Sequence, residues 1–444
     1  MPRGRDPMNL SGPESMWESY RARFDAVELG MLAVVAAGVI LRVRQYIFDR
    51  SLWLDESFIA LNLIRRSWSG LLEQLDFNQG AAPGFLLTEK LAASIDRGEL
   101  MLRAPSLILG VAAVGCAVPV ARRMCSRGAA IVACAIVALA PSLVYYSSEL
   151  KQYSGDVAAT LALTWMALLL YERPTLRRAA IAAGVGLAAV LLSQAAVLVA
   201  FGEGVVLVAA SLGVRRDRLR RPLVAAVAVW AGGAVLVVLH ALHAASSVRR
   251  SYGGSNSLLG GGSSSGGRSV LSPIPTSIAG DLGLPTAGAG FWAVVFVLGA
   301  IALAGAVSLV RRRPVPALLV LAPPFVTLCV SLAGQYPVTG RSVLFLIPAA
   351  GVLLAEGCSV AVSNLRNRFA AAVVGLAIVV FLFFDPARAD VRALASPVRH
   401  EELRTVIERI AADRRPGDRL YVAYAAQYPL AYYSECGCLE GQPW

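Results

Sequence analysis

The sequence predicts an all-α protein that crosses a membrane many times. Of its 444 residues, 57% are hydrophobic and 16% are charged, whereas soluble globular domains contain roughly 45–50% apolar and about 25% charged residues. Long uncharged runs recur between Val27 and Phe384. A soluble core could not bury so much apolar surface, so we expect lipid to surround most of the chain.

The lengths of the apolar runs predict about eleven membrane-spanning helices, because a helix needs about 20 apolar residues to cross the hydrocarbon layer. The run 179–213 is too long for one helix, and we expect it to turn near Ser193 and Gln194. Together the spans form a transmembrane domain over residues 27–385. They are predicted at 27–48, 102–121, 129–147, 156–171, 179–194, 195–213, 222–243, 290–310, 315–333, 341–362 and 369–385.

The arginines predict how these spans are oriented, because short basic loops stay in the cytoplasm. The basic loops are 122–127, 173–178, 215–221, 311–313 and 366–368. This rule places residues 1–26 in the cytoplasm and makes the protein a multi-pass protein of the cell inner (plasma) membrane. The segments expected outside are 49–101, 148–155, 244–289 and the C-terminal segment 386–444. The net charge of +12 is spread over separate loops, which excludes nucleic acid as a partner, since a basic stripe needs one continuous face.

The stretch 81–95 is apolar but short, and it carries Glu89 and Lys90 near its middle. Either charge at the bilayer centre would cost roughly 2.5–3.5 kcal/mol. We therefore expect this stretch to form an amphipathic helix on the outer membrane surface.

The first outer loop carries the acidic pair Asp55 and Glu56 directly after Trp53. A carboxylate at the membrane edge can take a proton from a hydroxyl group as a general base. Asp55 could equally cap the helix that starts near Ser57, which is a common role for aspartate. Residue type alone leaves both interpretations open.

The second outer loop is short and polar, and it contains Glu149, Lys151 and Tyr153. These side chains could line a site together with Asp55, and Lys151 could face a phosphate as a point charge. The alternative is an aromatic belt at the membrane interface with solvated charges between the rings.

Other residues are weaker candidates. His240 and His243 share one helical face near the outer end of a span and could bind phosphate or metal, although interfacial histidines are common. Arg341 begins the tenth span on its outer side and could neutralise a phosphate, or simply extend its charge to the membrane surface. Glu203 lies inside a span between two glycines, where a carboxylate either has a function or bonds a neighbouring helix.

Two segments outside the spans have a composition of their own. The stretch 251–269 is rich in glycine and serine and is expected to be a flexible linker or a mobile lid. The stretch 398–433 predicts a helix, a turn and a strand over 419–425, which would form a small outer α/β appendage. Cys436 and Cys438 form a lone C-x-C pair, which is a weak indication of metal or redox chemistry.

Three segments in order resemble the GT-C superfamily of polyprenyl-phosphate-sugar-dependent glycosyltransferases, especially protein O-mannosyltransferases and the lipid A aminoarabinose transferase. They are LWLDESFIALNLI with NQGAAPGFLLTEKLAA, then ELMLRAPSLILGVAAVGCAVPVARRM, then ALAPSLVYYSSELKQYSGDVAATLALTWMALLLYER. The resemblance extends over about residues 50–172 and is weaker later, in GQYPVTGRSVLFLIPAAGVLLAEG. It implies a GT-C-like bundle with juxtamembrane helices in the first outer loop.

The resemblance also implies roles for individual residues. Asp55 falls on the acid that is taken as the catalytic base, and Glu56 falls on the second acid of the same motif. Glu149 and Lys151 fall where polar residues of the second loop approach the site. Gln79 stands near the place where relatives carry a lysine, so it could hydrogen-bond a phosphate but could not neutralise it.

The implied activity is an inverting transfer of a sugar from a polyprenyl-phosphate donor to an extracytoplasmic acceptor, which could be a glycolipid, a polysaccharide or a protein. A divalent metal ion is a candidate cofactor, and the sequence does not identify its ligands. The alternative functions are a transporter or lipid flippase, which the position of Glu203 favours, and an O-antigen ligase or polymerase, which usually carries its large loop late in the chain.

Overall fold

The computed structural model describes residues 26–444 apart from 213–216, 253–272, 285–290, 339, 400, 416 and 439–444. The expected cytoplasmic segment 1–26 and the glycine- and serine-rich stretch 251–269 therefore lie almost wholly outside the described residues. Within the described ranges, all regular secondary structure is helical. This agrees with the predicted all-α fold class.

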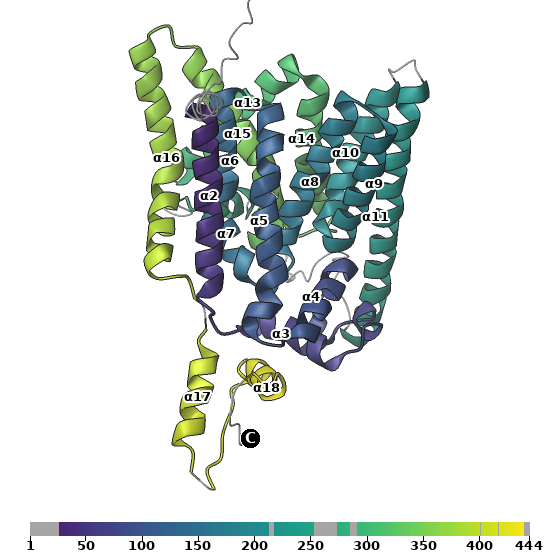
Figure 1. The fold of residues 1–444 in the computed structure, drawn as a ribbon, viewed down its shortest axis with the longest axis vertical. Helices are drawn as coiled ribbons and strands as arrows, with labels where there is room; N and C mark the ends of the chain where they lie inside the picture. Colours follow the sequence, from purple (N-terminus) through teal and green to yellow (C-terminus); the bar gives the residue numbers. More distant parts are fainter. Residues whose placement is uncertain are drawn as a thin grey trace, which may run out of the picture.

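Most of the helices stand side by side in one bundle (Figure 1). Each predicted span coincides with a helix of the bundle or, at 129–147 and 341–362, with two successive helical segments. The helices of the bundle are α2 (Ala26–Ile47), α5 (Glu99–Met124), α6 (Arg127–Leu139), α7 (Pro141–Tyr145), α8 (Tyr153–Glu172), α9 (Leu176–Leu192), α10 (Ala195–Leu212), α11 (Asp217–Tyr252), α13 (Phe291–Arg312), α14 (Pro314–Leu332), α15 (Ile347–Ser363) and α16 (Arg368–Ala395).

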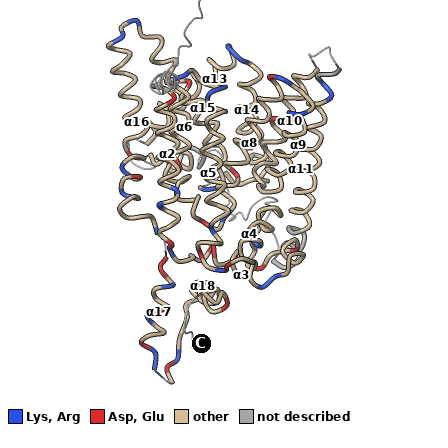
Figure 2. The backbone as a smooth tube through the Cα atoms, viewed as in Figure 1, with Lys and Arg blue, Asp and Glu red and all other residues tan. Residues whose placement is uncertain are grey.

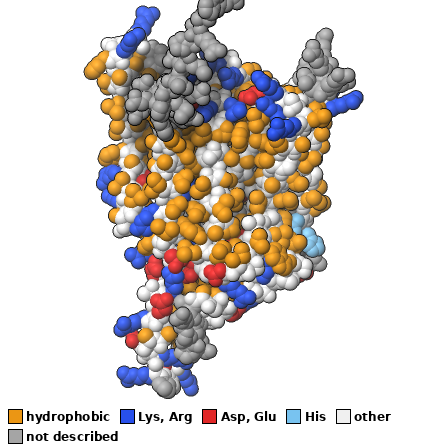
Figure 3. All heavy atoms as spheres, viewed as in Figure 1, with side chains coloured by type: hydrophobic (Ala, Val, Ile, Leu, Met, Phe, Trp, Pro, Cys, Tyr) orange, Lys and Arg blue, Asp and Glu red, His pale blue; other side chains and the backbone are white. Residues whose placement is uncertain are grey.

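Among the described residues, eight helices are long and apolar enough to cross a membrane, or nine if the bent pair Arg127–Leu139 and Pro141–Ser148 counts as one span. Hydrophobic side chains cover the middle of the bundle (Figure 3). On α13 and α16 only 11% of the most apolar window is buried, as expected for surfaces that face lipid. α2 and α9 stand beside these helices but are not among the eight, so the total of eleven spans remains a prediction.

The long apolar run 179–213 divides as expected. α9 ends at Leu192 and α10 begins at Ala195. Ser193 stabilises the break, because its hydroxyl accepts a hydrogen bond from the Ala196 amide at 3.0 Å and donates one to the Asp156 carboxylate at 2.6 Å.

Several short helices gather at one end of the bundle, which we call the site end. The predicted surface helix over 81–95 is present as α4, and the Lys90 amine caps α3 by donating to the carbonyl oxygens of Leu63 and Arg66 at 2.5 and 2.8 Å. The short helices around this end are α3 (Leu54–Arg65), η1 (Gly70–Leu72), η2 (Asp76–Asn78), α4 (Pro83–Ile95), η3 (Tyr146–Ser148), α12 (Pro273–Asp281) and η4 (Gly340–Leu346).

The C-terminal segment extends beyond the site end (Figure 1) and contains α17 (Leu403–Asp413) and α18 (Gln427–Glu435). The predicted helix near 400–413 is confirmed. The strand predicted over 419–425 is wrong, because these residues have no regular structure up to a turn. A strand needs a neighbour to satisfy its backbone hydrogen bonds, and the described residues provide none, so the appendage is helical.

Charged side chains differ between the two ends of the bundle. The charges at the end opposite α3 and α4 are mostly Lys and Arg, whereas the site end carries Asp and Glu together with Lys and Arg (Figure 2). The loops predicted to be basic therefore lie at one end of the bundle, and the loops with mixed charge lie at the other.

α13 and α15 cross with their backbones in contact, as small residues allow in membrane helices. A Cβ atom at Gly305 would lie 2.0 Å from the Leu353 carbonyl oxygen, whereas the space around Gly299 on the same helix is open. We expect Gly305→Ala to destabilise the protein by roughly 1–3 kcal/mol through overpacking. Thermal unfolding in detergent measures this, with Gly299→Ala as the control. Equal melting temperatures for the two variants would contradict the close contact between α13 and α15 at Gly305.

Candidate active site

Asp55 lies in the first turn of α3, where the helix dipole favours a carboxylate. Its carboxylate accepts a hydrogen bond from Lys151 Nζ at 3.0 Å and pairs closely with the Arg341 guanidinium. The residue before the helix is Trp53, so Asp55 does not cap the helix. Asp55 is therefore a largely buried carboxylate held between two cations.

Lys151 connects Asp55 to the first outer loop. Its amine also donates a hydrogen bond to Gln79 Oε1 at 2.9 Å. Gln79 reaches the lysine because Phe77 and Asn78 adopt left-handed backbone conformations, with φ of 61° and 54°. Residues other than glycine rarely adopt this conformation, and it often marks functional sites. Burial lowers the pKa of Lys151, while the neighbouring Asp55 carboxylate opposes this effect.

Arg341 comes from η4, far along the chain, and completes the group. Its guanidinium carbon lies 5.5 Å from the Trp53 ring centre and 5.2 Å from the Tyr153 ring centre. These distances allow cation–π attraction to both rings. An Arg341 nitrogen also lies 4.0 Å from Glu149 Oε1. The two aromatic rings thus hold the arginine in place beside Asp55.

Glu149 is fully buried next to this group. Its Oε1 accepts a hydrogen bond from Trp53 Nε1 at 2.7 Å, while its Oε2 has no hydrogen-bond partner in the described part of the protein. Burial, together with the nearby Glu56 carboxylate, raises the pKa of Glu149 to about 7, although Arg50 and Arg341 act in the opposite direction. Glu149 can therefore change its charge near neutral pH.

Glu56 has a different environment from its neighbour Asp55. It is fully buried, and both of its oxygens accept hydrogen bonds from Arg103, at 2.8 and 2.6 Å. Glu56 Oε1 also accepts a hydrogen bond from the Leu150 amide at 2.8 Å. Glu56 therefore joins the start of α5 to both outer loops.

Arg103 and Arg50 belong to the same network, although the sequence pattern did not indicate them. Arg103 donates to the carbonyl oxygens of Arg50 and Ser51 at 2.5 and 3.1 Å, and Arg50 donates to the Ser148 hydroxyl at 2.8 Å. Arg103 stands at the start of an apolar run, where an arginine usually extends to the interface. The available signal was a single charge at the start of an apolar run, which does not name its partner.

Two candidates from the sequence lie elsewhere. Glu203 is buried inside the bundle and accepts a hydrogen bond from Thr164 at 2.6 Å. His243 is exposed on α11, and the histidine side chains in Figure 3 lie on the flank of the bundle, apart from the charged side chains below. The other seven candidates lie together at the site end. They are Asp55, Glu56, Gln79, Glu149, Lys151, Tyr153 and Arg341.

The residues of this site do not form an evident metal centre. Among the described residues, no group of three or more His, Cys, Asp or Glu side chains is placed to hold a metal ion. Asp55 is paired with two cations, and Glu149 lies beside Arg341. The donor set thus fits an anionic ligand better than a cation.

An apolar cavity of about 400 Å³ lies between α12, α13, α14 and α15. Its described lining residues are apolar except Thr327. Val343 and Leu346 of η4 line it, and Arg341 belongs to the same short helix. η4 therefore connects the apolar cavity to the charged site.

The pair of Glu56 and Arg103 is expected to be essential for stability. Glu56→Gln would leave the Arg103 charge buried without its counter-charge, which typically costs about 3–5 kcal/mol. We expect a large fall in the melting temperature of the purified protein, or loss of folded protein from the membrane. Glu73→Gln, an exposed site in the same loop, is the control. A Glu56→Gln variant that melts like the wild type would contradict this role.

Glu149 is expected to make stability depend on pH. Its pKa of about 7 in the folded protein lies above the value of about 4.3 in an unfolded chain. As the pH rises between these values, the unfolded state releases a proton that the folded state keeps, so the folded state loses stability. The melting temperature of the wild type minus that of Glu149→Gln should therefore fall from about pH 5 to about pH 8. If the difference between the two melting temperatures does not change with pH, the pKa of Glu149 is not raised in the folded protein.

Comparisons with known proteins show similarity in structure and not in sequence. No protein-family model matches the chain, and no curated protein sequence is similar to it. The structure is similar to two structures of ArnT from Cupriavidus metallidurans. For ArnT bound to undecaprenyl phosphate, the TM-score is 0.56 at 15% identity, and the match covers 90% of this chain and 84% of ArnT. For ArnT in the apo state, the TM-score is 0.54 at 15% identity, and the match covers 95% of this chain and 85% of ArnT.

It is also similar to the archaeal oligosaccharyltransferase AglB from Archaeoglobus fulgidus, solved with an inhibitory peptide and a dolichol-phosphate (TM-score 0.53, 14% identity, 90% of this chain). The chain spans 59% of the length of that enzyme. These likenesses cover 90–95% of this chain. This multi-pass membrane protein therefore has a fold similar to that of ArnT and of AglB.

Proposed function

We propose that this protein is a membrane glycosyltransferase that moves a sugar from a polyprenyl-phosphate donor to an extracytoplasmic acceptor. The acceptor would be a glycolipid, a polysaccharide or a protein. The observation that carries the proposal is the carboxylate of Asp55 held between Lys151 and Arg341 at the end of a membrane bundle.

The donor would be bound by the charged site and the apolar cavity together. Lys151 and Arg341 supply the positive charge that a phosphate needs, and Gln79 adds a hydrogen-bonding amide. The cavity beyond η4 would take part of the polyprenyl chain. Two of the similar structures contain such lipids, dolichol-phosphate in AglB and undecaprenyl phosphate in ArnT, which supports this class of donor.

Asp55 would act as the base once the donor is bound. Without donor, its negative charge is neutralised by Lys151 and Arg341. A phosphate that pairs with the same two cations would compete with Asp55 and release its carboxylate. The released Asp55 can then accept the proton of an acceptor hydroxyl.

The chemical step is a single displacement at the anomeric carbon. The acceptor oxygen forms a bond to this carbon while its proton passes to Asp55, and the bond from the carbon to the phosphate oxygen breaks. The phosphate leaves with the electron pair, and Lys151 and Arg341 stabilise its charge. A base and a leaving group on opposite faces of the sugar give inversion, as in inverting sugar transfer in general.

Glu56 would act by positioning the site rather than by touching the reacting atoms. Both of its oxygens are occupied by Arg103, so it has little capacity to accept a further proton. Its bond to the Leu150 amide keeps the second loop, and with it Lys151, beside Asp55.

The site end would face the outside of the inner (plasma) membrane. The opposite end carries the gathered Lys and Arg side chains (Figure 2), which favour the cytoplasm. Cys436 and Cys438, which lie at the site end, form a disulfide, and disulfides persist in oxidising compartments outside the cytoplasm. Both observations support an extracytoplasmic site.

A transporter or flippase has less support. Its main indication was Glu203, which forms a hydrogen bond between α8 and α10 through Thr164. This contact is a sufficient structural role for a buried carboxylate in a helix bundle. The concentration of polar groups at one end, rather than midway through the bundle, favours the enzyme.

The test separates catalysis from donor binding. Asp55→Asn removes the base and also the group that competes with phosphate. We expect cells that carry only this variant to lose a sugar from their envelope glycolipids or glycoproteins, measured by intact mass. The purified variant should bind undecaprenyl phosphate about tenfold more tightly than the wild type, as expected when about 1.4 kcal/mol of competition is removed.

Asp96→Asn is the control, because Asp96 is an exposed aspartate of the same outer loop. It should keep both the glycan and the wild-type affinity. An unchanged glycan in cells with Asp55→Asn would refute the role of the base. A wild-type protein that fails to bind undecaprenyl phosphate would refute the donor class.

A further inference from the structure

The short segment 49–54 joins α2 to α3 and ends directly before Asp55. It contains no regular structure before Leu54, so its backbone amides need partners from elsewhere. Two of these partners are side chains of the C-terminal segment. The Leu52 amide donates to the Tyr433 phenol oxygen at 2.9 Å, and the Leu54 amide donates to Glu401 Oε2 at 3.2 Å.

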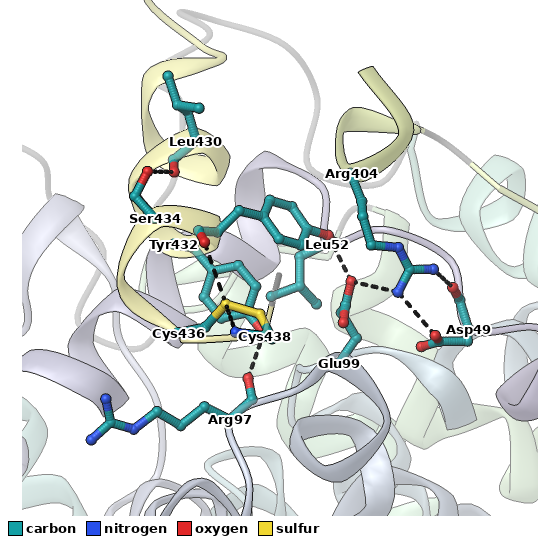
Figure 4. Close-up of a disulfide and its surroundings, with 11 residues drawn as sticks. Asp49, Leu52, Arg97, Glu99, Arg404, Leu430, Tyr432, Ser434, Cys436 and Cys438 are labelled. Atoms are coloured by element: carbon teal, nitrogen blue, oxygen red, sulfur yellow. Dashed lines mark hydrogen bonds and ion pairs between the residues drawn. A yellow bond between two sulfur atoms is a disulfide. The ribbon is translucent and has the colours of Figure 1, made fainter. Parts of the chain in front are cut away.

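Tyr433 also connects this segment to the start of α5. Its fully buried hydroxyl donates to Glu99 Oε1 at 2.9 Å. Arg404 of α17 donates to the same Glu99 oxygen at 3.1 Å and to Asp49 Oδ2 at 2.9 Å. Figure 4 shows Leu52, Glu99, Arg404 and Asp49 near the Cys436–Cys438 disulfide, which follows α18. These hydrogen bonds link Asp49, Glu99, Arg404 and Tyr433 into one polar network, which restricts the arrangement of the segment.

α18 reaches the other half of the first outer loop as well. The Tyr428 ring lies 4.8 Å from the Phe58 ring and 5.0 Å from the Phe77 ring. Phe77 belongs to the left-handed turn that brings Gln79 to Lys151. α18 thus contacts both α3, which carries Asp55, and the turn that positions Gln79.

The same helix shares a hydrophobic core with the site end. Tyr432 and Tyr433 are fully buried in a cluster that includes Leu52, Leu102 and Leu150. Leu150 is the neighbour of Lys151, and its amide bonds Glu56. The C-terminal segment therefore packs against the two outer loops that carry Asp55, Gln79 and Lys151, whereas Arg341 comes from η4.

We propose that the C-terminal segment is part of the catalytic unit and that Tyr433 is a positioning residue for Asp55. By accepting from the Leu52 amide and donating to Glu99, Tyr433 fixes the backbone that leads into α3. Asp55 then lies at hydrogen-bond distance from Lys151. This inference rests on the proposed function, because it concerns the same site.

The test compares two adjacent tyrosines. Tyr433→Phe removes the oxygen that bonds the Leu52 amide and Glu99, but keeps the ring. Tyr432→Phe is the matched control, because Tyr432 is equally buried on the same helix and its hydroxyl donates only to the Arg97 carbonyl oxygen at 2.6 Å. Both variants lose one phenol oxygen from the same core, so a general loss of stability affects both.

We expect kcat for sugar transfer from the polyprenyl-phosphate donor to fall about tenfold in Tyr433→Phe, because the substitution removes the two buried hydrogen bonds of this hydroxyl. The KM for the donor should stay close to the wild-type value, since Lys151 and Arg341 are retained. Tyr432→Phe should keep both constants. Equal effects of the two substitutions on kcat would overturn the proposal.

Hydrogen exchange of residues 49–56 provides a measurement that needs no activity. We expect these amides to exchange about tenfold faster in Tyr433→Phe than in Tyr432→Phe, because the Leu52 amide loses its partner. If the two variants exchange at different rates but the wild-type protein has no transferase activity, the proposed function is refuted and the positioning role of Tyr433 is retained. Equal exchange in an active enzyme would refute the positioning role alone.

Discussion

The buried ion pair between Glu56 and Arg103 is the interaction on which the site depends. A buried charge is costly unless its partner and its remaining hydrogen bonds are all in place. Here Arg103 satisfies both Glu56 oxygens, and Glu56 also holds the Leu150 amide. Asp55 directly precedes Glu56 in the chain and Lys151 directly follows Leu150. The buried pair therefore brings Asp55 and Lys151 together.

The groups around Asp55 form a site that is poised for an anion. Lys151 and Arg341 both face Asp55, while Glu149 lies behind Arg341 with one oxygen lacking a partner among the described residues. Burial opposes the charge on Lys151 and on Glu149 alike. When positive and negative charges in a buried site nearly cancel, the binding of one more negative group changes the electrostatic energy of the site strongly, because the local dielectric constant is low.

Much of the fold follows from the sequence, since hydropathy alone determines where helices can cross lipid. The turn at Ser193 and the surface helix that contains Lys90 were both predicted from charge. Long-range partners were not predictable in this way. Arg103 has no sequence signal that names Glu56 as its partner, and the turn at Phe77 requires a backbone conformation that residue type does not indicate. The strand expected over 419–425 failed because strands depend on neighbours that a local pattern cannot show.

The contact between Leu52 and Tyr433 joins residues that are 381 positions apart. Tyr433 follows every helix of the bundle, so during biosynthesis the ribosome must complete all of them before this tyrosine emerges. Until then, the Leu52 amide and Glu99 lack the hydroxyl that joins them. A nascent chain that has already inserted its helices would therefore still lack the hydroxyl group that holds residues 49–54 against the start of α5.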